Sequence, residues 1–150
     1  MTCEEMDITL PLGPFIVPLR ADQIDDAWPD AEPLIRSAQR RIEGHVWMCD
    51  VYNDLVAGNS MLWLVMLENK IKAALITQVE EHPRKRVWRV AYVGGSNMSV
   101  WIHDAVCAMK KAARIAGCSA IEADGRLGWA KIAPRLGFKE VTRAYEMEID

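Results

Sequence analysis

The chain has 150 residues, of which 51% are hydrophobic and 26% charged, and its net charge is −3 at pH 7. This length fits one domain over residues 1–150, and the composition allows a packed core, which excludes extensive disorder. The negative charge and the scattered basic residues leave no electrostatic footprint for nucleic acid, so we expect no nucleic-acid partner.

The cysteines and the N-terminus are typical of a cytoplasmic protein. Cys3, Cys49, Cys107 and Cys118 show no C-x-x-C spacing, so we predict reduced, mostly buried thiols, no disulfide and no metal site. The acidic N-terminus is unlike a secretory signal. The longest apolar run, residues 61–67, is too short to cross a bilayer, and no membrane partner is expected.

The first part of the chain is predicted to be an extended arm followed by helices. Three prolines and a glycine between residues 8 and 19 favour an arm over residues 1–20 with a short edge strand near 15–17. A helical apolar pattern follows, but Pro29 and Pro33 interrupt it. We therefore expect a short helical piece and then a longer helix from about Pro33 to Glu43, ended by Gly44.

A second short helix and a set of strands come next. Asp50 can cap a helix that runs through Leu55 and ends at Gly58. Runs of β-branched and aromatic residues then predict strands that tight turns join into antiparallel pairs, over residues 61–67, 71–79 and 87–93.

The second half of the chain alternates helices and strands. Apolar spacing from Met98 to Met109 predicts a long helix over about 97–116. A strand over 118–123, a short helix over 127–135 and an alternating strand over 138–149 complete the order. The strands on either side of the long helix should be parallel. We therefore predict an α/β fold with a mixed, mostly antiparallel sheet and helices on both faces.

The main functional signal is the pair Gly94-Gly95 between a predicted strand and the long helix. A glycine turn that leads into a helix exposes unpaired N–H groups at the positive end of the helix dipole, where a phosphate can bind. The same pair can equally form a tight turn with no ligand, and both interpretations stand at this point.

The order of elements resembles that of the GNAT superfamily of acyl-CoA-dependent N-acetyltransferases, with Val93-Gly94-Gly95 before the long helix and Leu136-Gly137-Phe138 before the last strand. With residues 125–129 included, the chain looks most like the compact GNAT-like proteins of bacteriophages. The resemblance implies acetyl-CoA as cosubstrate. Its pyrophosphate would lie on the backbone of Val93, Gly94, Gly95, Ser96, Asn97 and Met98, with Arg126 at a phosphate or paired with Asp124.

The resemblance also implies where an amine acceptor would bind. It would lie where the strands 87–93 and 118–123 part, under the loop over residues 45–49. Trp47 and Trp129 could line that pocket, or they could cover an interface with a protein partner.

Two residues that many family members use in catalysis are missing here. Ala133 stands where they carry a tyrosine as general acid, and the strand over 87–93 has no carboxylate to act as general base. The candidate replacements are Asp50, Tyr92 and Glu122. Each has a structural alternative, because Asp50 can cap a helix, Tyr92 can pack against the long helix and Glu122 can face solvent.

Two functions follow from these observations. The first is an acetyl-CoA-dependent N-acetyltransferase that acts on a small amine or a protein amino group by direct transfer in a ternary complex. The second is a catalytically degenerate GNAT-fold protein that serves as a structural or interaction module, in a phage virion or against a host protein. The missing tyrosine and carboxylate favour the second function, and the glycine pair with its helix favours the first. The sequence does not indicate the oligomeric state.

Overall fold

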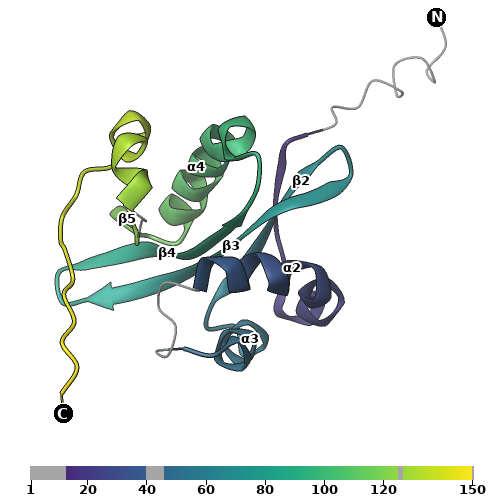
Figure 1. Cartoon of the computed structure of the whole chain (residues 1–150), viewed down its shortest axis with the longest axis horizontal. Helices are drawn as coiled ribbons and strands as arrows, with labels where there is room; N and C mark the ends of the chain where they lie inside the picture. Colours follow the sequence, from purple (N-terminus) through teal and green to yellow (C-terminus); the bar gives the residue numbers. More distant parts are fainter. Residues whose placement is uncertain (1–12, 40–45, 125–126, 150) are drawn as a thin grey trace, which may run out of the picture.

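The computed structural model describes residues 13–39, 46–124 and 127–149. They form a five-stranded sheet in the order β1-β2-β3-β4-β5, with helices on both faces (Figure 1). Neighbouring strands are antiparallel except β4 and β5, which are parallel. The predicted fold class, an α/β fold with a mixed, mostly antiparallel sheet, is confirmed.

The strands follow the predicted order and are longer in the middle of the sheet. Their bounds are β1 Phe15–Pro18, β2 Met61–Leu67, β3 Lys70–His82, β4 Lys85–Gly95 and β5 Ala120–Ala123. The turn between β2 and β3 consists of Glu68 and Asn69, with φ of 53° and 63°. Two consecutive positive φ angles match the twist of a two-residue hairpin, so β2 and β3 pair closely.

The two faces of the sheet carry separate apolar layers. Helices α2 (Ile24–Gln39) and α3 (Met48–Val56) cover one face, where they pack on Leu62, Leu64 and Ile76. Helix α4 (Met98–Ile115) covers the other, where it packs on Trp63 and Trp88 (Figure 1). The alternation of side chains along β2 produces both layers from one strand.

Helix α4 confirms the predicted apolar spacing. Trp101, Ala105, Met109 and Ala113 are all buried, at successive turns of the helix. Gly117 follows with φ of 76°, and the amide of Cys118 donates to the carbonyl of Ala113. This arrangement satisfies carbonyls at the end of the helix, as expected for a glycine stop.

Helix α2 differs from the prediction, because it is continuous through Pro29 and Pro33. Each proline removes a helical hydrogen bond. The stripe Ile24, Ala31 and Ile35 is nevertheless fully buried against the sheet. Tertiary packing therefore outweighs the local preference of the two prolines. Gly44, the predicted stop, lies outside the described residues.

The C-terminal part also differs from the prediction. Residues 138–149 form no strand, and the predicted short helix is replaced by two 3₁₀ helices, η3 (Leu127–Lys131) and η4 (Ala133–Leu136). Pro134 lies at the start of η4, where its missing N–H costs least.

The prediction of mostly buried thiols is wrong for the described cysteines. Cys49 and Cys107 are exposed and Cys118 is partly exposed, all three as free thiols, while Cys3 lies outside the described residues. Within the described ranges, no helix is both long and apolar enough to span a bilayer.

Candidate active site

The central feature of the candidate site is the point where β4 and β5 part. The two strands pair from Val87 with Ala120 to Val90 with Ala123. There β5 ends, while β4 continues to Gly95. Among the described residues, no strand pairs with residues 91–95 on this side, and we call this stretch the free edge. It offers N–H and C=O groups to a ligand.

A β-bulge lies at the same point. Thr77 pairs with Val90 and Ile76 pairs with Tyr92, so Ala91 has no partner on β3. A bulge re-aims the side chains around it. Here Ala91 and Tyr92, although consecutive in the sequence, both line one pocket.

That pocket, which we call the Tyr92 pocket, has a volume of about 220 Å³. It lies between α3 and the sheet, and its walls are Val46, Val51, Asp54, Ser60, Ile76, Gln78, Ala91 and Tyr92. The Oγ atom of Ser60 is buried, and no group in the described part of the chain forms a hydrogen bond with it. A buried hydroxyl without a partner is costly, so a polar ligand atom would stabilise it.

The phenol of Tyr92 is partly buried near two carboxylates. Burial raises the pKa of Tyr92 above its usual 10.0, and the nearby carboxylates of Asp54 and Asp50 raise it further. The phenol is therefore neutral at physiological pH and can donate a hydrogen bond.

The N-terminus of α4 lies at the end of β4. Asn97 is the N-cap residue, with φ of 59° and ψ of 35°, and its side chain forms no capping hydrogen bond. The amides of Met98 and Ser99, which open the helix, have no acceptor within it. This end of an 18-residue helix carries partial positive charge.

The glycine pair does not form the predicted turn. Gly94 and Gly95 belong to β4 and pair with Ala74 and Ala73 of β3. A Cβ on Gly94 would lie 1.9 Å from the carbonyl oxygen of Leu34 in α2. Gly95 has φ of 145°, and its Cβ would lie 2.4 Å from the carbonyl oxygen of Lys72. Both glycines are therefore required by close approach of the protein's own backbone.

The residue after the pair is also engaged within the protein. The amide of Ser96 donates to the carbonyl of Lys72 at 2.9 Å, and its own carbonyl accepts from Nε1 of the buried Trp101 at 2.8 Å. Of the predicted phosphate cradle, the Ser96 amide is thus occupied, whereas the Met98 amide forms no backbone hydrogen bond with any described residue.

Two of the candidate catalytic carboxylates have structural partners. Asp50 is exposed, and its Oδ2 accepts the amide of Trp47 at 2.9 Å, which caps α3. Helix α3 begins at Met48, so Asp50 lies inside its first turn rather than before it. Glu122 is partly buried and close enough to Arg89 to raise the pKa of that guanidinium.

The two tryptophans predicted to line the acceptor pocket do not line the Tyr92 pocket. Trp47 is 70% exposed at the start of α3, and Trp129 belongs to η3. Arg126 lies outside the described residues. Among the described residues, no cluster of three or more His, Cys, Asp or Glu side chains could hold a metal ion.

The structure adds three polar residues that the sequence interpretation missed: Asp54, Ser60 and Gln78. A signal existed for two of them. Asp54 follows Asp50 by one helical turn, and Gln78 is a polar residue in β3 that follows the apolar run 73–76 and Thr77. Nothing in the sequence marks Ser60, because its burial depends on the packing of α3 against the sheet.

Comparisons with known proteins identify the fold. No family model matches the chain, and neither does any curated protein. Solved structures match nearly all of it. A GCN5-related N-acetyltransferase from Ralstonia eutropha has a TM-score of 0.65 at 16% identity, covering 89% of this chain and 97% of that one.

Two further structures show the same likeness. A ribosomal-protein-alanine N-acetyltransferase from Brucella melitensis has a TM-score of 0.66 at 11% identity, with 90% of this chain and 99% of that one covered. An aminoglycoside N-acetyltransferase in complex with CoA has a TM-score of 0.62 at 12% identity, with 90% and 93% covered. This chain therefore has the fold of the GNAT N-acetyltransferases.

Proposed function

We propose that this protein is an acetyl-CoA-dependent N-acetyltransferase that transfers the acetyl group directly to an amine in a ternary complex. One observation carries the proposal. The strands β4 and β5 part at the bulge of Ala91 and leave a free edge between the N-terminus of α4 and the Tyr92 pocket. The fold likeness to acetyltransferases, one of them in complex with CoA, supports it.

Some backbone amides along this free edge and at the start of α4 could bind acetyl-CoA. Because Ser96 donates its amide to β3, the alternation of backbone groups in an antiparallel pair directs the amides of Gly95 and Val93 to the free edge. These amides would bind the pantetheine arm and the thioester carbonyl. The amides of Met98 and Ser99, at the N-terminus of α4, would hold the pyrophosphate, with Asn97 beside them. Arg126 remains a proposed phosphate contact.

The Tyr92 pocket would take the acceptor. Its volume of about 220 Å³ suits a small amine or a single protein amino group rather than a large ligand. Asp54 supplies a carboxylate that attracts an ammonium group. The exposed acidic residues of α2 and α3, which are Asp25, Asp26, Asp30, Asp50 and Asp54, would draw a cation toward this face.

The chemistry needs three proton transfers. Asp54 would accept the first proton from the acceptor ammonium, directly or through a water, and pass it to solvent. The free amine then attacks the thioester carbon, a C–N bond forms, the strand amides stabilise the oxyanion, and the C–S bond breaks. Tyr92 would give a proton to the departing thiolate, because its raised pKa keeps the phenol protonated at neutral pH. The second proton of the attacking nitrogen would return to the Tyr92 oxygen through a water, which leaves a neutral amide and a neutral phenol.

Cosubstrate binding can be tested with acetyl-CoA and a pair of matched variants. A ligand that binds the folded state raises the melting temperature. Ser99→Glu places an anion at the start of α4, which favours the helix but repels a pyrophosphate. His103→Glu places the same charge one turn further along. We expect acetyl-CoA to raise the melting temperature of the wild type and of His103→Glu, but much less that of Ser99→Glu. Equal shifts in all three proteins would contradict the proposed cradle.

Catalysis can be tested with small polyamines and amino-terminal peptides as acceptors, with release of the CoA thiol as the readout. We expect Tyr92→Phe and Asp54→Asn each to reduce the rate by roughly a hundredfold, with acetyl-CoA binding unchanged. Full activity of both variants would remove their proposed roles.

One observation favours a second function: the Ser96 amide donates a hydrogen bond to the carbonyl of Lys72. A GNAT-fold protein that has lost acetyl-CoA binding could keep this closed β4–α4 connection and work as an interaction module. The absence of any melting shift with acetyl-CoA or CoA would favour this function over the transferase.

A further inference from the structure

Two neutral polar side chains of the Tyr92 pocket, Ser60 and Gln78, lie side by side on the sheet. The pairing of β2 with β3 begins at Met61 and Thr77, and one step further along the same register sets Ser60 opposite Gln78. Both residues line the pocket. Residues directly opposite each other have Cβ atoms about 4.5–5.5 Å apart. The hydroxyl and the amide, which we call the polar pair, can therefore bond to the same ligand atom.

The hydroxyl of Ser60 has no partner in the described part of the chain. Its Oγ atom is buried and forms no hydrogen bond there. Such a group costs free energy until a ligand or a water bonds to it. Because no described group holds the hydroxyl in place, rotation about χ1 can turn it into the pocket that Ser60 lines. A ligand that bonds to this hydroxyl thus gains a hydrogen bond without breaking an existing one.

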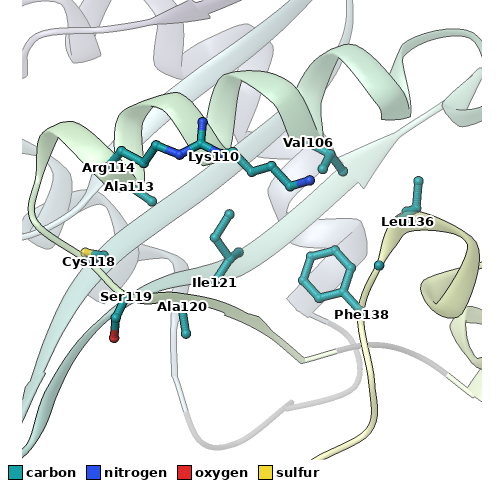
Figure 2. A pocket seen from close by; sticks show the side chains of 11 residues that line it. Val106, Lys110, Ala113, Arg114, Cys118, Ser119, Ala120, Ile121, Leu136 and Phe138 are labelled. Atoms are coloured by element: carbon teal, nitrogen blue, oxygen red, sulfur yellow. The ribbon is translucent and has the colours of Figure 1, made fainter.

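The charge of the Tyr92 pocket narrows the choice of ligand. Among the described residues that line it, Asp54 is charged at neutral pH, and there is no lysine, arginine or histidine. A second pocket, between α4 and β5, differs in this respect, because Lys110 and Arg114 lie along its wall (Figure 2). A carboxylate or phosphate on the acceptor would meet no cation in the Tyr92 pocket and would be repelled by Asp54. The group that bonds to the polar pair is therefore neutral.

We propose that the polar pair binds a hydroxyl group of the acceptor, which is a short primary amine with a hydroxyl group further along its carbon chain. This inference rests on the proposed function, because it takes the acceptor amine to lie beside Asp54. A hydroxyl both donates and accepts a hydrogen bond, and so do serine and glutamine side chains. Val51, Ile76 and Ala91 give the carbon chain an apolar wall. The volume of about 220 Å³ equals that of about seven water molecules at about 30 Å³ each, which suits a chain of a few carbons.

Four acceptors with the same number of non-hydrogen atoms test the proposal on the full-length protein. 3-Amino-1-propanol carries the hydroxyl group, and n-butylamine has a methyl group in its place. 1,3-Diaminopropane has a second ammonium group, and glycinamide has the amide of a protein amino terminus. Release of the CoA thiol from acetyl-CoA gives kcat/KM for each acceptor. Isothermal titration in the presence of CoA gives the Kd of each without any transfer.

Two serine variants show whether the polar pair is responsible for the preference. Ser60→Ala removes one hydroxyl from the pair, and Ser119→Ala is the matched control, because Ser119 lies on the wall of the second pocket (Figure 2). We expect the wild type and the control to prefer 3-amino-1-propanol to the other three acceptors by at least about tenfold, in kcat/KM and in Kd. Ser60→Ala should lose most of its preference over n-butylamine. Its melting temperature should be no lower than that of the wild type, since the lost hydroxyl is unbonded.

The two readouts separate this inference from the proposed function. Equal or better use of any of the other three acceptors would overturn the inference and leave the transferase standing. A preference that Ser60→Ala keeps in full would overturn it too. If no acceptor is acetylated but the preference persists in Kd and depends on Ser60, the hydroxyl subsite stands and the proposed function fails. Neither transfer nor any preference in Kd would overturn both.

Discussion

At the scale of single residues, Gly94 shows how a glycine can be mistaken for part of a ligand site. In the sequence it stands where a phosphate-binding turn is expected. In the structure it lies within β4, where α2 crosses so closely that the Leu34 carbonyl occupies the place of a side chain. The glycine is needed for the close contact between α2 and β4 of the sheet.

Gly94→Ala should therefore destabilise the protein strongly. The added Cβ would meet a backbone oxygen that no side-chain rotation can move, and we expect a loss of at least about 3 kcal/mol in the free energy of unfolding. Gly58→Ala is the control, since Gly58 has φ of 79° with open space around it and should lose only about 1 kcal/mol from backbone strain. Urea denaturation of both variants measures the difference, and equal losses would contradict the contact.

Tyr92 gives a prediction about pH. Burial, with the charges of Asp54 and Asp50, raises its pKa above 10.0 in the folded protein, so the folded chain keeps a proton that the unfolded chain releases. This contribution to stability is fully present below pH 10 and is lost as the pH rises through the raised pKa.

Tyr92→Phe should remove this part of the loss of folding stability at alkaline pH. Tyr145→Phe, at an 88% exposed position, should not. Urea denaturation at about pH 9 and about pH 11 compares the two variants with the wild type. Identical pH dependence in all three proteins would show that Tyr92 is not buried beside the two carboxylates.

At the scale of elements, β5 is short and depends on Arg89 of β4. The guanidinium pairs with Glu80 at 2.9 Å and with Asp124, just after β5, at 3.0 Å. Partial burial lowers the pKa of Arg89, but Asp124, Glu80 and Glu122 outweigh this effect and raise it. Arg89 therefore holds the end of β5 at the point where the strands part.

Arg89→Met should lower the free energy of unfolding by about 1–2 kcal/mol, because two carboxylates lose a half-buried partner. Arg20→Met is the control. Arg20 and Asp22 form an ion pair with side chains 73% and 71% exposed, which should contribute less than about 0.5 kcal/mol. Urea denaturation at low and at about 1 M salt measures both. A loss no larger than that of the control would show that Arg89 does not hold β5.

At the scale of the whole molecule, the two faces of the sheet are covered by different helices, and these helices differ in charge. Helices α2 and α3 expose Asp25, Asp26, Asp30, Asp50 and Asp54, with Arg36 as their basic residue. Helix α4 carries Lys110, Lys111 and Arg114 toward its C-terminus. The acidic side is the one with the proposed acceptor pocket, whereas Lys110 and Arg114 line a pocket between α4 and β5 on the other side. Charge therefore distinguishes the proposed acceptor face from the face that α4 covers.

Much of the architecture was predictable, because it rests on local patterns. The apolar spacing of Trp101, Ala105 and Met109 follows the helical period, and the central strands follow from their β-branched and aromatic residues. Turn residues such as Gly58 and Gly117 need a positive φ, which their sequence context already indicates. These signals depend on neighbours along the chain, so the sequence alone determined the order of elements from α3 to β5 and the α/β class.

Long-range contacts were decided only by the tertiary structure. Pro29 and Pro33 lie inside α2 because burial against the sheet outweighs their local cost. The pocket of Tyr92, Asp54 and Ser60 exists because a bulge at Ala91 turns two consecutive residues to one face. The alternating C-terminal segment pairs with no strand in the described chain, because alternation specifies an apolar face but not the strand that pairs with it. A pattern in the sequence specifies which face of an element is apolar, whereas only the folded chain specifies what that face meets.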